Sequence, residues 1–288
     1  MATALVTGTS TGIGLATAVT LARAGHFVFA TMRNPDGGGE LSEIIETEDL
    51  PVTLVTLDVD DDASVVGAIK RVLEEKGHID VLVNNAGVGG GGAVEEVPLA
   101  DFRQIMETNF FGALRCMQAV LPSMRQRGEG CIVNVSSIAG RIAAAPQGPY
   151  ASSKWALEAL SECLAQEVKP FNIRVALVEP GIIATPIFTK AKPLRPDSPY
   201  PQSRRIRALF QEALKNPVSP YVVAELIREI VENGSWQLRY PVGADASALL
   251  QTRAGLTDEE WIARGAVDDD EWVAMIKRDR GLDIKLSS

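Results

Sequence analysis

The chain has 288 residues, of which 46% are hydrophobic and 23% are charged, and its formal net charge is −9. This length and composition are sufficient for one large domain with a sizeable core. The negative charge and the lack of a lysine or arginine cluster argue against nucleic acid as a partner. The first expected strand begins near Thr3 and no apolar run is long enough to cross a bilayer, so we expect a cytoplasmic protein without a membrane span.

Short, almost continuously apolar runs alternate with amphipathic segments along most of the chain. Such runs are typical of parallel strands that are covered on both faces. We expect strands at Thr3–Thr7, Phe27–Thr31, Val52–Leu57, Asp80–Val83, Cys131–Val135, Ile173–Val178 and Trp236–Tyr240. The alternation predicts an α/β fold, a single doubly wound Rossmann-type domain whose mainly parallel seven-stranded sheet is flanked by helices.

The alternation breaks after about Ile182. We expect the Rossmann-type domain to span residues 1–250, with a substrate lid region at 182–215 and a helical, acidic C-terminal tail at 251–288. The segment Lys190–Gln202 contains four prolines, and both a mobile lid and a plain surface loop fit it. In the tail, Thr257 and Glu260 fit a capping box at the start of a helix. We interpret the tail as a packing or subunit-contact element.

Few residues are available for metal or disulfide chemistry. Cys116, Cys131 and Cys163 are widely spaced and odd in number, so we expect small core residues in a reducing compartment. The two histidines, His26 and His78, each follow a glycine at an expected helix end, where the helix dipole favours a cation. We therefore expect no metal site.

Directly after the first strand the sequence reads TGTSTGIG, from Thr7 to Gly14. One interpretation is a G-x-S-x-G turn with Ser10 as a nucleophile. The other is a glycine loop that lets a dinucleotide phosphate approach the backbone at a helix N-terminus. A serine hydrolase needs a histidine base, and neither histidine is expected to face the loops that follow the strands. We therefore favour the dinucleotide loop.

Small and polar residues recur where the expected strands end. Because ligands of an open parallel sheet bind beyond the carboxyl ends of its strands, these positions predict a cofactor site. They are Gly8, Met32-Arg33, Asp58, Asn84-Asn85-Ala86-Gly87, Ser136-Ser137 and Pro180-Gly181.

Tyr150 and Lys154 are spaced to lie on one face of a helix, about one turn apart. A free tyrosine has a pKa of about 10 and is a poor base at neutral pH. A lysine ammonium nearby would favour the phenolate and lower the pKa of the tyrosine. Tyr150 would then exchange a proton with an alcohol or carbonyl oxygen while hydride moves to or from a nicotinamide, and Ser137 would hydrogen-bond the same oxygen.

In combination these residues resemble the short-chain dehydrogenase/reductase superfamily, from Thr3 to Thr185. The resemblance implies a catalytic group of Ser137, Tyr150, Lys154 and Asn109, in which Asn109 holds a water of a proton relay to the lysine. Lys154 would also bind the ribose of the nicotinamide. The cofactor site implied by the resemblance comprises Gly8, Thr9, Ser10, Thr11, Gly12, Ile13, Gly14, Arg33, Asp58, Val59, Asn85, Ala86, Gly87, Tyr150, Lys154, Pro180, Gly181, Ile183 and Thr185.

The resemblance also implies individual roles. Asp58 would contact the adenine, Asn85 would lie against the cofactor while supporting the sheet, and Pro180-Gly181 with Thr185 would hold the carboxamide. Two alternatives remain open on the residues alone. Asp58 also fits the N-cap of the following helix, and Asn109 also fits a residue that merely satisfies a helix kink.

The end of the second strand bears on the choice of cofactor. A carboxylate there bonds the ribose 2′-hydroxyl of NAD, whereas a 2′-phosphate needs a cation. The strand ends Ala30-Thr31-Met32-Arg33-Asn34, with no acidic residue before Asp36. Arg33 can form charge-assisted hydrogen bonds to a phosphate, and the small Thr11 leaves space for it. The sequence therefore predicts a preference for NADP(H). The alternative is NAD(H), with an Arg33 that only points into solvent.

The stretch FVFATMRN, from Phe27 to Asn34, and the Pro-rich segment resemble the branch of 17β-hydroxysteroid and retinol dehydrogenases. We expect an NADP(H)-dependent oxidoreductase of the carbonyl reductase type. Its substrate would be a small apolar secondary alcohol, ketone or aldehyde, bound between residues 138–147, 182–190 and the lid. The alternatives are a non-catalytic dinucleotide-sensing protein and a dehydratase or epimerase on the same fold. The family implies a homodimer or homotetramer.

Overall fold

The computed structural model describes residues 1–35 and 39–286. Its strands form one seven-stranded sheet in the order β3-β2-β1-β4-β5-β6-β7, and every neighbouring pair is parallel. The strands are β1 (Thr3–Thr7), β2 (Phe27–Met32), β3 (Val52–Thr56), β4 (Val81–Asn84), β5 (Gly130–Val135), β6 (Ile173–Pro180) and β7 (Arg239–Val242). The predicted doubly wound α/β fold is therefore confirmed.

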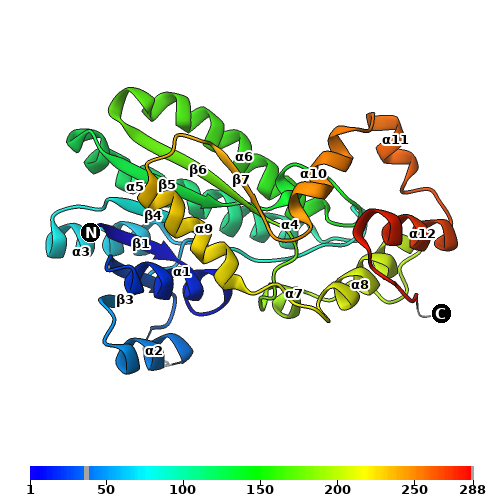
Figure 1. Ribbon diagram of the computed structural model, residues 1–288, viewed down its shortest axis with the longest axis horizontal. Coiled ribbons are helices and arrows are strands. Elements are labelled where there is room, and N and C mark those ends of the chain that lie inside the picture. The colour runs from blue at the N-terminus through cyan, green and yellow to red at the C-terminus, as the bar shows by residue number, and fades with distance from the viewer. Residues whose placement is uncertain (36–38, 287–288) are drawn as a thin grey trace.

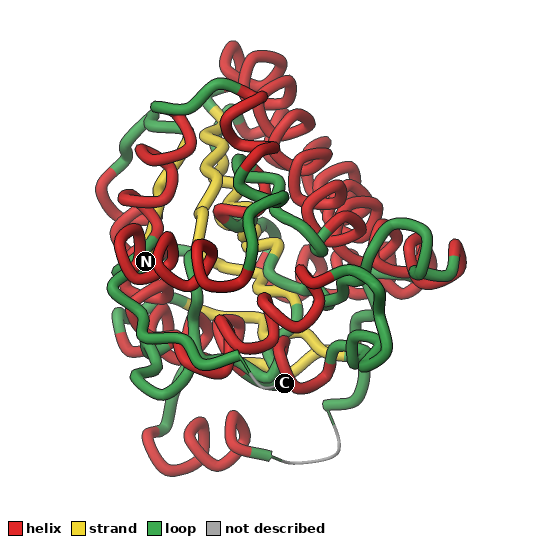
Figure 2. The backbone as a smooth tube through the Cα atoms, turned by 90° about the vertical axis from the view of Figure 1, so that its right-hand side faces the viewer, coloured by secondary structure: helices red, strands yellow, loops and turns green. Residues whose placement is uncertain are grey.

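Helices cover both faces of the sheet, as the two-sided apolar strands predict (Figure 2). In β1, Ala4 and Val6 pack on one face against α1, α2 and α9. Leu5 points to the other face and packs against α3, α5 and α6, because successive strand residues alternate between faces. These six helices are α1 (Gly12–Arg23), α2 (Glu40–Glu48), α3 (Asp62–Lys76), α5 (Gly112–Arg127), α6 (Gly148–Val168) and α9 (Pro220–Asn233).

The remaining helices lie mostly beyond one end of the sheet, on the right of Figure 1, towards which the arrow of β1 points. In the tail, the predicted capping box between Thr257 and Glu260 is confirmed at the start of α11. These helices are α4 (Leu99–Met106), α7 (Ile187–Lys190), α8 (Pro201–Ala213), α10 (Ala246–Ala254), α11 (Asp258–Ala263) and α12 (Asp269–Arg280), with a π-helical turn η1 (Glu107–Phe111) and the short 3₁₀ turns η2 (Ile138–Gly140) and η3 (Lys169–Phe171).

Several sequence-based expectations need correction. The last strand is displaced from Trp236–Tyr240 to Arg239–Val242 and includes Pro241. An edge strand tolerates proline because one side of its backbone needs no hydrogen-bond donor, so Pro241 does not end the strand. The Pro-rich segment gives way to helix at Pro201, which occupies the first turn of α8, where a missing N–H is harmless. Cys163 is exposed, unlike the buried Cys116 and Cys131.

Within 1–35 and 39–286, no helix combines the length and hydropathy needed to cross a membrane. The boundary expected at residue 250 falls inside α10, and the last two residues of the expected tail lie outside the described part of the chain.

Candidate active site

The glycine loop between β1 and α1 is shaped by backbone conformations and contacts that exclude side chains. Gly8 and Gly12 have positive φ angles of 71° and 63°, which glycine adopts without strain. A Cβ on Gly14 would lie 2.2 Å from the Gly8 carbonyl oxygen. Thr11, the N-cap of α1, forms no side-chain cap hydrogen bond, and the first turn carries no acidic residue. The N-terminal N–H groups of α1 therefore favour an anion such as a phosphate.

Asn85, which follows β4, holds this loop closed. Its Nδ2 donates to the carbonyl oxygens of Thr7 at 2.9 Å and Gly8 at 3.1 Å. In return, Thr7 Oγ1 accepts from the backbone N–H groups of Asn85 and Ala86, both at 3.0 Å. The ends of β1 and β4 are thus joined by side-chain hydrogen bonds that continue the sheet. A loop held in this way is fixed in shape before any ligand arrives.

The ends of β2 and β3 supply the outer rim of the candidate cofactor site. Arg33 directly follows β2 and is exposed, whereas Asp36 lies outside the described residues. Asp58 follows β3; its Oδ1 accepts from the N–H of Asp60 at 3.1 Å. The N-cap of α3 is Asp61, whose carboxylate accepts from Ser64 N–H. The alternative that Asp58 caps α3 is therefore wrong.

Ser137, Tyr150 and Lys154 come together beyond the end of β5. Ser137 caps η2 by accepting from the N–H of Ala139 at 3.1 Å, and its hydroxyl lies 3.4 Å from the Pro180 carbonyl oxygen. Tyr150 and Lys154 lie in the first two turns of α6, with the Lys154 Nζ 5.7 Å from the centre of the Tyr150 ring. The buried Lys154 Nζ donates to the Val135 carbonyl oxygen at 2.9 Å. A hydroxyl, a phenol and an ammonium thus share one small site.

The protonation equilibria of this group are set mainly by burial. Burial raises the pKa of Tyr150, and the hydrogen bond with Ser137 opposes that rise. The expected lowering of the Tyr150 pKa by Lys154 is therefore wrong for this structure. Burial lowers the pKa of Lys154 from 10.5 to about 8, against the opposing effect of the Glu158 carboxylate. Lys154 therefore titrates closer to neutral pH than Tyr150 does.

Asn109 lies in the π-helical turn η1, which interrupts the helix between α4 and α5. Its Oδ1 accepts from the N–H of Val88 at 2.8 Å, and its Nδ2 donates to the Val88 carbonyl oxygen and to Ser153 Oγ, both at 3.0 Å. Ser153 in turn donates to the Tyr150 carbonyl oxygen at 2.7 Å. Asn109 therefore connects the segment after β4 to the helix that carries Tyr150. Its side chain does more than pair backbone groups freed by a helix kink. The sequence did not single out Ser153.

The segment after β6 lies over the glycine loop. A Cβ on Gly12 would lie 3.2 Å from the Thr185 side chain, and one on Gly181 would lie 1.9 Å from Asp245 Oδ1. The N–H of Ile182 donates to the Asp245 carboxylate at 3.3 Å, while Ile183 is buried. The sequence missed Asp245. Asp245 lies just beyond the carboxyl end of β7, which is where site residues are expected. The last strand predicted from the sequence ended at Tyr240, so Asp245 was not placed at a strand end.

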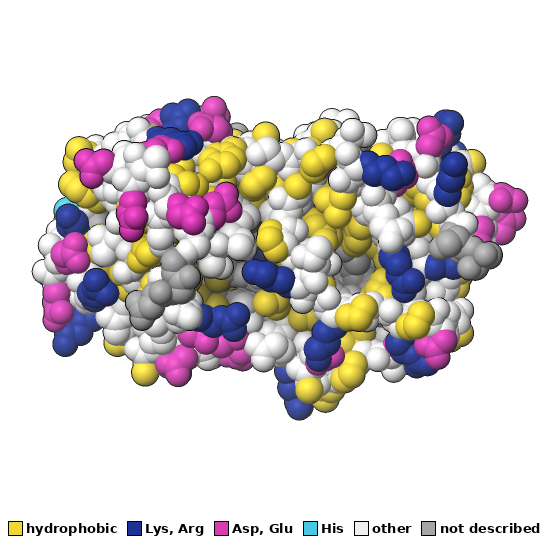
Figure 3. Space-filling model, turned by 90° about the horizontal axis from the view of Figure 1, so that it is seen from below, with side chains coloured by type: hydrophobic (Ala, Val, Ile, Leu, Met, Phe, Trp, Pro, Cys, Tyr) yellow, Lys and Arg dark blue, Asp and Glu magenta, His cyan; other side chains and the backbone are white. Residues whose placement is uncertain are grey.

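The surface beside this site is apolar. Figure 3 views the side on which α7 and α8 lie in Figure 1, and it shows a hollow right of centre with hydrophobic walls and Lys and Arg side chains around its rim. Leu209 of α8 packs with Ile276 of α12 and with Ile182. Trp261 Nε1 donates to the Ala143 carbonyl oxygen at 2.8 Å. The tail therefore contacts both α8 and the loop between Ser137 and Tyr150.

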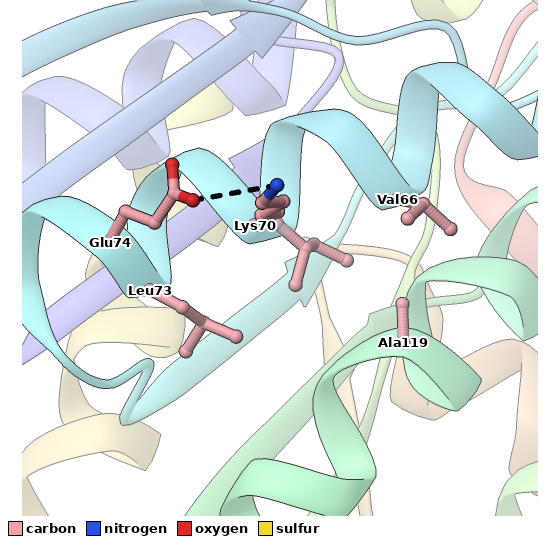
Figure 4. Close-up of a pocket in the computed structure, with 6 residues that line it drawn as sticks. Val66, Lys70, Leu73, Glu74 and Ala119 are labelled. Carbon is pink, nitrogen blue, oxygen red and sulfur yellow. Dashed lines mark ion pairs between the residues drawn. The ribbon is translucent and has the colours of Figure 1, made fainter.

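A separate groove lies between α3 and α5 (Figure 4). Val66, Leu73 and Ala119 line it, together with an ion pair between Lys70 and Glu74. None of the candidate site residues lines this groove. Among the described residues, no group of three or more His, Cys, Asp or Glu is placed to hold a metal ion.

Comparison with known proteins defines the class of protein to which this site belongs. Residues 2–195 match the family model for short chain dehydrogenase. The chain therefore belongs to the short-chain dehydrogenase/reductase family and is an oxidoreductase by family.

Individual relatives agree with this class. The uncharacterized oxidoreductase YusZ of Bacillus subtilis is 39% identical over 90% of this chain and 95% of its own length. Retinol dehydrogenase 8 of Bos taurus is 44% identical over 64% of this chain and 59% of its own length.

Two solved structures share the fold over most of their length. A short-chain dehydrogenase from Streptomyces avermitilis has a TM-score of 0.80 at 36% identity, over 93% of this chain and 99% of that one. A single-substitution variant of actinorhodin polyketide ketoreductase, solved with NADPH, has a TM-score of 0.73 at 28% identity, over 84% of this chain and 95% of that one.

Proposed function

We propose that this chain is an NADP(H)-dependent oxidoreductase that interconverts apolar secondary alcohols and ketones, or aldehydes. The observation that carries the proposal is the placement of Ser137, Tyr150 and Lys154 beyond the end of β5, at the same edge of the sheet as the glycine loop. In open parallel sheets this edge is where ligands bind.

The residues present fit a dinucleotide. The space around Gly8, Gly12 and Gly14 is too small for side chains, and the free N-terminus of α1 favours a phosphate. Arg33, exposed at the end of β2, would bind a 2′-phosphate, while Asp58 and Val59 would border the adenine. Thr185 and Ile183 would border the nicotinamide carboxamide. When bound, the cofactor supplies or accepts the hydride. The NADPH in the ketoreductase neighbour supports the choice of NADP(H).

The proton chemistry falls to the side chains of this chain. In the reducing direction Tyr150 would donate its phenolic proton to the carbonyl oxygen, which Ser137 would hold by a hydrogen bond. The raised pKa of Tyr150 keeps the phenol protonated and able to act as this acid. The Lys154 ammonium would bind the ribose hydroxyls and stabilise the phenolate that remains after proton transfer. Asn109 would hold a water through which the proton is replaced.

An apolar substrate is supported by the hydrophobic hollow in Figure 3 and by the name of retinol dehydrogenase 8, a relative over part of the chain. The lid at 182–215 and the loop at 138–147 would enclose the substrate. Family resemblance further supports a homodimer or homotetramer.

The test combines cofactor titration with turnover. Fluorescence titration with NADPH and NADH measures binding, and oxidation of NADPH is then followed with a panel of apolar ketones and aldehydes. We expect Tyr150→Phe to bind NADPH as the wild type does and to lose at least about 100-fold in kcat, the usual scale of acid–base catalysis. Tyr221→Phe, in α9, is the matched control and should retain activity. Binding without turnover in the wild type would instead indicate a dinucleotide-sensing protein.

A further inference from the structure

Behind the candidate catalytic group lies a buried pair of carboxyl side chains. Glu158 of α6 is 4% exposed and Glu179 of β6 is fully buried. Glu158 Oε2 accepts from Arg239 Nε at 2.9 Å, and Glu179 Oε1 accepts from Arg141 Nη1 at 3.2 Å. The Arg239 Nε also lies 3.6 Å from Glu179 Oε1. Burying charge in this way is costly unless each charge is compensated.

This carboxyl pair lies next to the catalytic group. Glu158 lies one helical turn after Lys154 on the same face of α6, and Glu179 directly precedes Pro180. A Cβ on Gly140 would lie 2.8 Å from both Glu158 Cγ and Ser136 Oγ. The segment that carries Ser137 therefore packs directly on Glu158.

The two arginines do not compensate Glu158 completely. Arg239 is shared with Glu179 and with the exposed Glu162, to which its Nη2 donates at 2.6 Å. Within the described part of the chain, the ion pair of Arg141 is with Glu179. The Glu158 Oε1 atom is buried and has no hydrogen-bond partner among the described residues. One oxygen of the Glu158 carboxylate therefore has no compensating donor, and its negative charge acts on its surroundings.

Lys154 is a buried cation one helical turn before Glu158 on α6. Its Nζ donates to a neutral acceptor, the Val135 carbonyl oxygen. In a buried setting an opposite charge one helical turn away acts with little screening by solvent. Arg239 on β7 binds Glu158 directly. The other charged groups of this cluster are Lys154 and Glu162 on α6 and the Glu179–Arg141 pair.

We propose that Glu158 is a positioning residue whose buried carboxylate keeps the neighbouring Lys154 ammonium charged at the working pH. Tyr150 and a bound ribose would then meet an ammonium instead of a neutral amine. The catalytic role of Lys154 rests on the proposed function, whereas the electrostatic link between Glu158 and Lys154 does not. The direction in which Glu158 acts on the Lys154 pKa agrees with this link.

The test is an NMR titration of the full chain labelled with ¹³Cε-lysine. The Lys154 signal is assigned by its loss in Lys154→Arg. In Glu158→Gln we expect the Lys154 pKa to fall by about one unit, because an opposite charge is removed. Glu162→Gln is the matched control, since Glu162 binds the same Arg239 but is exposed, and it should leave the Lys154 pKa unchanged. Glu158→Asp keeps the charge and should also leave it close to the wild-type value.

The proposal is overturned if the Lys154 pKa is the same in Glu158→Gln as in the wild type. It is equally overturned if Glu162→Gln, or Glu158→Asp, lowers the pKa as much as Glu158→Gln does. Thermal unfolding checks that each variant is folded. If Glu158→Gln does not fold, Glu158→Met, which also removes the charge, takes its place with the same expected fall in the Lys154 pKa.

Turnover provides the second measurement. The high-pH limb of kcat/KM should move to lower pH in Glu158→Gln and stay in place in Glu162→Gln. If the wild-type protein reduces no carbonyl substrate, the proposed function is wrong. The NMR titration would still test the electrostatic link between Glu158 and Lys154.

Discussion

The Asn85 amide donates to the carbonyl oxygen of Gly8 at 3.1 Å, so the loop after β1 is held from the end of the neighbouring strand β4. The same amide nitrogen would lie 2.4 Å from a Cβ on Gly14. The hydrogen bond from Asn85 to Gly8 therefore requires that residue 14 has no side chain. A side chain at Gly14 would break the contact that shapes the candidate phosphate site.

This arrangement predicts the effect of Gly14→Ala. The added methyl group would displace the Gly8 carbonyl or the Asn85 amide, so we expect NADPH binding to be lost and stability to fall by about 1–3 kcal/mol. Fluorescence titration and urea unfolding measure the two effects. Gly67→Ala is the control, because Gly67 lies in α3 with nothing within 4 Å of its added Cβ. It should bind NADPH normally and be more stable by about 0.5–1 kcal/mol. Normal NADPH binding by Gly14→Ala would exclude the loop as the phosphate site.

Arg33 provides a separate prediction on cofactor choice. If its guanidinium binds the 2′-phosphate, Arg33→Ala should lose about 10–100-fold in NADPH affinity, the size of a lost charged hydrogen bond. NADH affinity should hardly change, because NADH lacks that phosphate. Arg71→Ala removes another exposed arginine, from α3, and should change neither affinity. Equal losses for NADPH and NADH in Arg33→Ala would show that Arg33 does not distinguish the cofactors.

Local patterns explain which features the sequence could predict. The glycine loop, the Tyr150–Lys154 spacing and the apolar strands each lie within one short segment, so sequence periodicity and spacing suffice to find them. Asp245 could not be found in the same way, because its contact with Gly181 depends on the pairing of β6 with β7. The end of β7 could not be located either, since whether Pro241 ends a strand depends on that strand being at an edge.

The same distinction applies to charge. The sequence places Lys154 beside Tyr150, and from this proximity alone a lowered Tyr150 pKa follows. The opposite direction in the structure arises from burial, which is a property of the packed site. Similarly, Glu158, Glu179 and Arg239 come from three different elements, and only the fold brings them into contact.

The buried ammonium of Lys154 is expected to lower the free energy of unfolding. Its pKa is lowered to about 8 from 10.5, so between these values the folded state holds fewer protons than the unfolded state. The contribution of this group to stability therefore rises with pH across that window. At pH 7, burial of the Lys154 ammonium destabilises the folded state by about 1.4 kcal/mol for each unit by which the Lys154 pKa is lowered.

Removal of the ammonium tests this cost. We expect Lys154→Met to lose turnover. Its free energy of unfolding at pH 7 should nevertheless exceed that of the wild type by about 2 kcal/mol, after allowance for the lost hydrogen bond to Val135. The difference from the wild type should shrink at pH 10. Urea unfolding at both pH values measures it. Lys70→Met removes an exposed lysine and should change stability little at either pH. A Lys154→Met protein that is less stable than the wild type at pH 7 would contradict this account.

Arg205 of α8 connects this helix to the C-terminal tail. Its guanidinium is buried, with Nε donating to Asp269 Oδ1 at 2.9 Å and Nη2 donating to the Val267 carbonyl oxygen at 2.8 Å. Asp269→Asn would leave the buried guanidinium without its carboxylate. Breaking a buried pair in this way typically costs about 3–5 kcal/mol, and less where one partner is partly exposed.

Asp269 is partly exposed, so we expect Asp269→Asn to lower the free energy of unfolding by about 2 kcal/mol. Because α8 lies in the proposed lid, the KM for an apolar ketone should rise while kcat stays within about twofold, the signature of weakened substrate binding. Thermal unfolding and steady-state kinetics measure these effects. Asp270→Asn is the control, since Asp270 is the adjacent, exposed residue of α12. If both variants behave alike, the Arg205–Asp269 pair does not hold the lid, and the apolar contacts of Leu209 with Ile276 must hold it instead.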